Sequence, residues 1–199
     1  MKRLSTELRQ EQIIDEAISL IHNNGFSSLS IRELAYKVGI SEAAIYRHFK
    51  SKDEIINGIF RRIQSLSKEL FFELNSINHP DKKLKAFILF HMNLFTQHPE
   101  LVSILMSEEI FEHNSSYSEV LKSTIKNRHA ALIKIIDDGV KNQIFIGVDS
   151  DTLSAMIQGF IRLTLLKWKS SKNKFSLLET GEKFFKTLQT LLNKKQKHS

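Results

Sequence analysis

The segment from Gly25 to Glu54 constrains the fold most, because it places several helix boundaries within a short length of chain. Ser30 followed by Glu33 has the spacing of a capping box, in which the serine hydroxyl accepts from the backbone N–H three residues on. A helix is therefore predicted to begin at Ser30 and to end at Gly39, since glycine adopts the left-handed conformation at little cost. Apolar residues recur at helical spacing between these points: Ile31, Leu34, Ala35 and Val38.

A second short helix is predicted to begin at Ser41, with Ile45 and Phe49 pointing into the core. Its other side chains are expected to lie largely outside: Glu42, Ala43, Ala44, Tyr46, Arg47 and His48. Ser51 with Glu54 repeats the capping-box spacing and predicts a third helix. Two short helices joined by a glycine-containing turn can form a helix-turn-helix, whose second helix enters the major groove of DNA. Spacing alone leaves an ordinary helical hairpin in an all-α core as the alternative.

The residue types of this segment are more informative than the spacing of its helix caps. The run LAYKVGISEAAIYRHFKSKDEI, Leu34 to Ile55, closely resembles the DNA-binding domain of the TetR family of bacterial transcriptional regulators. The resemblance extends from about Ile13 to Phe60, and beyond it only the length and the helical pattern agree. It implies phosphate contacts and a surface near the bases, each carried over position by position. The phosphate contacts would be Tyr46, His48 and Lys52, and the surface near the bases would be Ser41, Glu42, Ala43, Ala44 and Arg47.

The surface expected near the bases departs from the family pattern at three positions. Many members carry Lys, Arg or Pro where this chain has Glu42, and Gly or Thr where it has Ala43 and Ala44. A carboxylate is repelled by phosphates but can accept from a cytosine amino group, and alanine methyls can contact thymine methyls. The operator sequence therefore does not transfer from the family.

Composition is typical of a helical protein with a real core. The chain has 199 residues, 41% of them hydrophobic, with seven Gly, two Pro and no Cys, and no period-two stretch indicates a strand. The absence of cysteine excludes disulfides and thiolate metal sites. The N-terminus has no signal-peptide pattern and no apolar run approaches the length of a membrane span, so a cytoplasmic protein is expected.

The net charge of +7 does not by itself indicate DNA binding, because of where it lies. Residues 172–199 hold seven Lys/Arg and two Asp/Glu, whereas residues 72–171 are balanced and residues 1–71 carry a surplus of two. Phosphate neutralisation must therefore come from the local cluster of Arg47, Lys50 and Lys52, doubled in a dimer.

Three parts are predicted along the chain. Residues 1–52 form a helix-turn-helix domain, a long helix over 53–75 connects, and residues 76–199 form a helical effector-binding and dimerisation domain. Arg61 and Arg62 on the long helix are interpreted as a solvated face or as links to acidic neighbours. Further helices are predicted near 81–97, 99–113, 116–142, 149–170 and 175–194, with Gly139 and Gly159 marking tolerated exceptions or close helix approaches.

The second domain carries aromatic and Met-rich helical faces, which are more typical of plain core than of a ligand cavity. The family resemblance favours the cavity, because its members typically enclose a small-molecule effector among these helices. The candidate lining is Phe87, His91, Phe95, Leu105, Phe111, His129, Gln158 and Arg162. So apolar a set suits a hydrophobic effector, acyl or aromatic, with Arg162 available for an anionic end if it faces inward.

The last two helices carry more apolar residues than one thin domain needs. The candidate dimer interface is Met156, Phe160, Leu163, Phe184, Leu188 and Leu191. The resemblance implies a four-helix bundle across a two-fold axis, which sets two reading helices about one turn of DNA apart. Whether Trp168 belongs to the core or to the interface is left open.

These features predict a repressor that binds a palindromic operator as a homodimer and leaves it when a small hydrophobic effector binds. An enzyme is not expected, because the best pair, Glu109 and His113 one helical turn apart, offers too few ligands for a metal, and no cofactor is implied. The alternative is a DNA-bound architectural or partner-binding factor. Residues 41–49 and HPELVSILM, His98 to Met106, are similar to nucleoid-occlusion factors of the same family.

Overall fold

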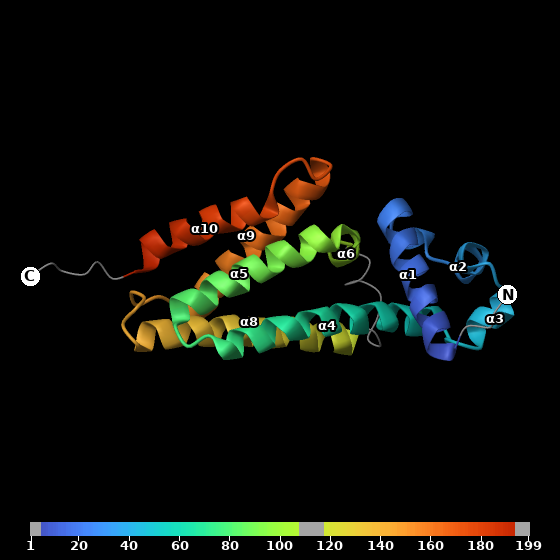
Figure 1. The fold of residues 1–199 in the computed structure, drawn as a ribbon, viewed down its shortest axis with the longest axis horizontal. Coiled ribbons are helices and arrows are strands. Elements are labelled where there is room, and N and C mark those ends of the chain that lie inside the picture. Colours follow the sequence, from blue (N-terminus) through green and yellow to red (C-terminus); the bar gives the residue numbers. More distant parts are fainter. Residues whose placement is uncertain (1–4, 108–117, 194–199) are drawn as a thin grey trace, which may run out of the picture. The chain divides into compact units, whose positions relative to one another are not determined.

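The structure, a computed structural model, describes residues 5–107 and 118–193. Within these ranges it is built from α-helices with one short 3-10 turn and no β-strand (Figure 1). The predicted all-α fold with an N-terminal helix-turn-helix is confirmed. Its described residues form two compact units, drawn from 1–66 with 99–123 and from 67–98 with 124–199. The domain boundaries expected at 52 and 76 stay predictions.

The first unit contains the helix-turn-helix. Its elements are α1 (Thr6–Asn24), the 3-10 turn η1 (Phe26–Ser28), α2 (Ile31–Val38), α3 (Glu42–Tyr46), the first part of α4 (Lys52–Ser76) and α6 (Pro99–Leu105). Helix α1 packs on α2 and on α6, and α2 packs on α3. The fully buried side chains Ile13, Leu34 and Ile45 place the centre of this core between α1, α2 and α3.

Local signals explain the helix ends in this unit. Ser30 Oγ accepts from Glu33 N at 3.2 Å, and Gly39 ends α2 in the left-handed region with φ 72° and ψ 37°. Ser51 Oγ likewise accepts from Glu54 N at 3.2 Å. The Glu54 carboxylate accepts from Lys50 N rather than from the Ser51 amide, so this capping box is displaced by one residue.

The second unit contains the remainder of α4 with α5 (Pro80–Gln97), α8 (Ser118–Lys141, from Thr124 on), α9 (Ser150–Ser170) and α10 (Leu177–Leu192). Helices α5, α9 and α10 pack on one another. Trp168 is 6% exposed and its Nε1 donates to the Phe175 carbonyl at 2.9 Å, so it belongs to the core. The C-terminal end of α10 is tied to the loop after α8, where Ile146 N donates to Leu192 O at 2.7 Å.

The two glycines inside predicted helices differ. Gly139 on α8 lies directly against the ring of the buried Phe145, whereas no atom lies within 4 Å of the place where a side chain would start at Gly159. Gly139 therefore makes room for a ring of the following loop rather than for another helix, and Gly159 is an open position.

The helix predicted over 99–113 is too long, because α6 ends at Leu105. Ser107 N bonds to Ile104 O, the i to i+3 pattern with which a helix closes. Phe111, Glu109 and His113 lie outside the described residues. No helix in the described ranges is long and apolar enough to cross a membrane.

Candidate nucleic-acid interface and effector region

The helix-turn-helix is held by the short turn between α2 and α3. Gly39 turns the chain, and Ile40 N donates to Ala35 O at 3.0 Å, which satisfies a terminal carbonyl of α2. Ser41 Oγ then accepts from Ala44 N at 3.2 Å and starts α3. Helix α3 is only five residues long, so Arg47 and His48 lie in the turn that follows it.

Most of the side chains predicted to lie outside in this segment are exposed. Ser41, Glu42, Ala43 and Arg47 are exposed, and Tyr46 is 52% exposed. The expectation that Ala44 lies outside is wrong, because it is 7% exposed. A helix as short as α3 needs more than Ile45 to fix it, and the Ala44 methyl supplies part of that packing.

Two contacts with residues distant in sequence hold the chain between α3 and α4. Gln10 Nε2 on α1 donates to the His48 carbonyl at 2.9 Å. Lys52 Nζ lies 5.8 Å from the centre of the Phe26 ring, a cation–π distance that holds the ammonium at the start of α4. Sequence reasoning missed Gln10, because its partner is 38 residues away and only packing brings the two together.

His48 is half-buried, and its Nδ1 is buried without a hydrogen-bond partner among the described residues. Burial, and then the positive charges of Arg9 and Arg47, lower the pKa of His48 below its ordinary value. The imidazole is therefore mainly neutral near pH 7 in the DNA-free protein.

The two arginines of the long helix have different environments. Arg62 bonds to Asp15 Oδ1 at 2.7 Å and to Glu11 Oε2 at 3.1 Å, as the interpretation of a link to acidic neighbours expected. Arg61 is exposed and lines, with Gln10 and Phe49, an open cleft of about 580 Å³ between α1 and α4.

The predicted effector residues occupy different environments. Phe87, His91 and Phe95 are buried on α5, and His129 and Gln158 are half-buried. Arg162 is exposed on α9, and Leu105 is half-buried on α6 in the first unit. Phe111 lies outside the described residues.

His91 is joined to an arginine that sequence reasoning missed. Its Nδ1 lies 2.7 Å from the Phe87 carbonyl oxygen, which can only accept, so Nδ1 carries the proton. Nε2 then accepts from Arg128 Nη1 at 3.4 Å. Burial, and then the Arg128 charge, lower the pKa of His91 to about 3, so the ring stays neutral at physiological pH. Nothing in the local pattern of α8 separates Arg128 from its exposed lysines.

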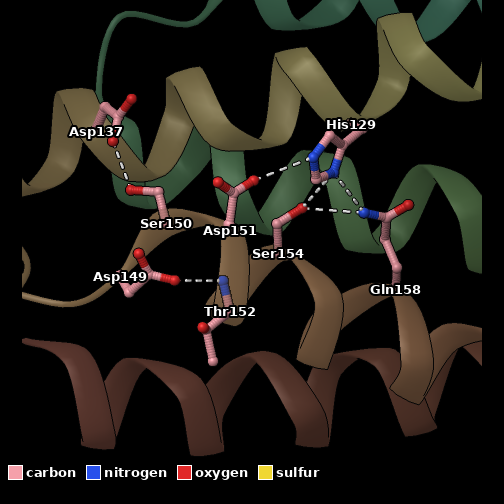
Figure 2. A network of polar contacts seen from close by, with 8 residues as sticks. All are labelled: His129, Asp137, Asp149, Ser150, Asp151, Thr152, Ser154 and Gln158. Atoms are coloured by element: carbon pink, nitrogen blue, oxygen red, sulfur yellow. Dashed lines mark hydrogen bonds and ion pairs between the residues drawn. The ribbon is translucent and has the colours of Figure 1, made fainter.

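A second polar network joins α8 to α9 (Figure 2). His129 Nδ1 lies 3.0 Å from Ser154 Oγ and 3.1 Å from Gln158 Nε2, and His129 Nε2 lies 3.3 Å from Asp151 Oδ1. An amide N–H only donates, so Nδ1 accepts and Nε2–H faces the carboxylate.

Serine, histidine and aspartate also make up hydrolytic triads, but here Ser154 is 0% exposed. A hydroxyl that no substrate can reach does no acyl transfer, so we assign the network to helix packing. No group of three potential metal ligands gathers in the parts of the chain that the structure describes.

The predicted dimer residues divide between surface and core. Met156, Leu163 and Leu191 are 62%, 52% and 62% exposed, so these three are available to a partner. Phe160 on α9 and Phe184 on α10 stack with ring centres 3.7 Å apart and join the two helices. Leu188 is 5% exposed and packs inside its own chain.

Two family models match the chain. The model of "Bacterial regulatory proteins, tetR family" matches residues 13–59, and that of "YsiA-like protein, C-terminal region" matches residues 60–190. The fatty acid metabolism regulator protein of Bacillus subtilis is 24% identical over 84% of this chain and 87% of its own length. Nucleoid occlusion factor SlmA of Vibrio cholerae is 25% identical over the same shares. The crystal structure of the transcriptional regulator FadR from Bacillus subtilis in complex with stearoyl-CoA, 23% identical, superposes with a TM-score of 0.78 over 89% of this chain and 96% of that one.

Proposed function

Because the chain belongs to the TetR family and is a DNA-binding transcriptional regulator, we propose that it acts as a homodimeric repressor, released from a palindromic operator by an acyl-type effector. The observation that carries the DNA-binding half is the exposed surface of α3 and the turn after it. Arg47 and Tyr46 project from a segment that Ile45 and Phe49 anchor in the core. Ser41, Glu42 and Ala43 lie beside the bases in this proposal, and Tyr46, His48 and Lys52 meet phosphates.

The effector half rests on the relatives and on the second unit. Relatives that match this chain over most of its length include a regulator of fatty acid metabolism and one bound to stearoyl-CoA. The buried aromatic side chains Phe87 and Phe95 suit an acyl chain, and the neighbouring His91 supplies polarity. An effector that binds better to a form with wrongly spaced reading helices would draw the population away from DNA.

Selection of bound DNA from a random pool tests the proposal directly. Enriched sequences are expected to be palindromic, with half-sites about 10 base pairs apart from centre to centre. Saturated acyl-CoA thioesters of graded length are then added to the complex, with free coenzyme A as the control. Failure to enrich any sequence would overturn the DNA-binding half. A complex that survives every thioester would overturn the effector half and favour the alternative, a DNA-bound architectural or partner-binding factor similar to the nucleoid occlusion factor.

The proposed dimer interface is formed by the exposed apolar side chains of α9 and α10. A charge introduced there should separate the two protomers. Leu163→Asp is expected to weaken the dimer at least about hundredfold, because the two-fold axis buries two unpaired carboxylates. The fold should survive, since Leu163 is 52% exposed in the single chain. Light scattering after size exclusion measures the mass, and circular dichroism the helix content. Phe72→Asp, at a position 82% exposed on α4, is the matched control and should remain dimeric. A dimeric Leu163→Asp protein would move the interface elsewhere.

Operator affinity should rise as the pH falls toward the lowered pKa of His48 in the free protein. In the free protein the pKa of His48 is lowered, whereas nearby phosphates would raise it, so the complex binds more protons than its components between the two values. Each His48 takes up at most one proton, which limits the effect to about tenfold per pH unit per copy. His48→Gln should flatten the profile, and His22→Gln, at an exposed position on α1, should leave it intact. A wild-type slope in His48→Gln would refute the phosphate contact.

A further inference from the structure

The second unit holds a partly desolvated cation, Arg128, which has no counter-charge among the described residues. Arg128 is half-buried on α8, and burial lowers its pKa. Among the described residues the guanidinium has one hydrogen-bonding partner, the neutral His91 ring, and no carboxylate within ion-pair distance. Taking a charge out of water is costly unless an opposite charge and further hydrogen bonds compensate for it.

The histidine that meets this cation lies among aromatic rings. The ring centres of Phe87 and Phe90 lie 4.6 Å and 5.8 Å from that of His91. His91 Nδ1–H is held by the Phe87 carbonyl, so the ring is fixed and its Nε2 lone pair faces Arg128. A guanidinium has five N–H donors, and one of them faces His91, which leaves others for a ligand. His91 thus acts as a positioning residue for Arg128.

We propose that Arg128, oriented by His91, is the anion-binding point of the second unit and takes the charged oxygens of an amphipathic ligand whose apolar chain lies among the neighbouring aromatic rings. The ligand chemistry is an anionic oxygen group, a carboxylate or a phosphate, attached to a long alkyl chain. This deepens the proposed function and rests on its acyl effector. It also replaces Arg162 as the arginine for the anionic end, since Arg162 is exposed.

Calorimetry on the intact protein with three probes tests whether Arg128 binds the anionic group of an alkyl ligand. Stearate carries a carboxylate, stearoyl-CoA carries phosphates, and octadecanol is uncharged. Arg128→Met is expected to weaken the better anionic probe by about thirtyfold or more, the usual effect of removing one partner of a buried charge pair, and to leave octadecanol unchanged. Lys126→Met removes an exposed charge from the same helix and should bind every probe like the wild type. The preferred anionic probe identifies the group. Equal affinity of wild type and Arg128→Met for both anions would overturn the proposal.

Thermal unfolding without an acyl ligand separates this proposal from the acyl effector. If the Arg128 guanidinium has no opposite charge until an anion binds, the free wild type carries an uncompensated charge. Arg128→Met replaces that charge by an apolar chain of similar length. It should therefore unfold at a higher temperature than both the wild type and Lys126→Met. Inorganic phosphate should stabilise the wild type more than Arg128→Met. If both thermal results are obtained but no alkyl probe binds, the acyl effector is rejected and the anion site at Arg128 is still supported. A lower unfolding temperature of Arg128→Met, with equal effects of phosphate on both proteins, would assign Arg128 to structure alone.

Discussion

Arg47→Ala is expected to weaken operator binding by about 2–6 kcal/mol per dimer, because each lost contact costs about 1–3 kcal/mol and a two-fold complex contains it twice. Arg47 is exposed in the turn just after α3, so its removal should leave the unfolding temperature unchanged. Fluorescence anisotropy with the selected operator and with unrelated DNA, over a series of salt concentrations, measures the effect.

The same titrations decide what Arg47 contacts. A base contact predicts relaxed preference at one operator position, whereas a phosphate contact predicts equal weakening on all sequences and a smaller salt dependence. Arg61→Ala removes an exposed arginine of α4 in the same unit and should bind operator like the wild type. Unchanged operator affinity in Arg47→Ala would contradict the proposed reading surface.

Gly139→Ala is expected to destabilise the protein by about 2–3 kcal/mol and to lower its unfolding temperature by roughly 4–12 °C. A Cβ at this position would overlap the ring of Phe145, which is 1% exposed and has little room to retreat. Alanine gains about 1 kcal/mol over glycine in a helix interior, so the steric cost decides the sign. Denaturant titration and calorimetry measure both quantities.

Gly147→Ala provides the control. No atom lies within 4 Å of the Cβ that alanine would add there, and this glycine has no positive φ. The change should be neutral or should stabilise the protein by a few tenths of a kcal/mol, since it restricts the unfolded chain. A Gly139→Ala protein as stable as Gly147→Ala would mean that the Phe145 ring can move aside.

The helix-turn-helix could be predicted because each of its signals is local. A serine cap and the amide it binds are three residues apart, and the left-handed turn needs only Gly39. Burial at single positions was harder to predict, as Ala44 illustrates. Helical periodicity assigns a face to each residue, but α3 is too short for a stable face, and its contact with α2 decides what is covered.

The sequence by itself therefore determined the all-α fold, the DNA-reading module and the family, since these follow from periodicity, caps and a specific motif. Only the tertiary structure decided which polar groups meet. Gln10 bonds to the His48 carbonyl across 38 residues, Arg62 pairs with Asp15 across 47, and Arg128 approaches His91 across 37. Each side chain is unremarkable on its own helix, and its partner depends on how that helix packs against another. Packing also isolates Arg128 from any carboxylate among the described residues, and this desolvated charge gave the anion site that the linear pattern did not contain.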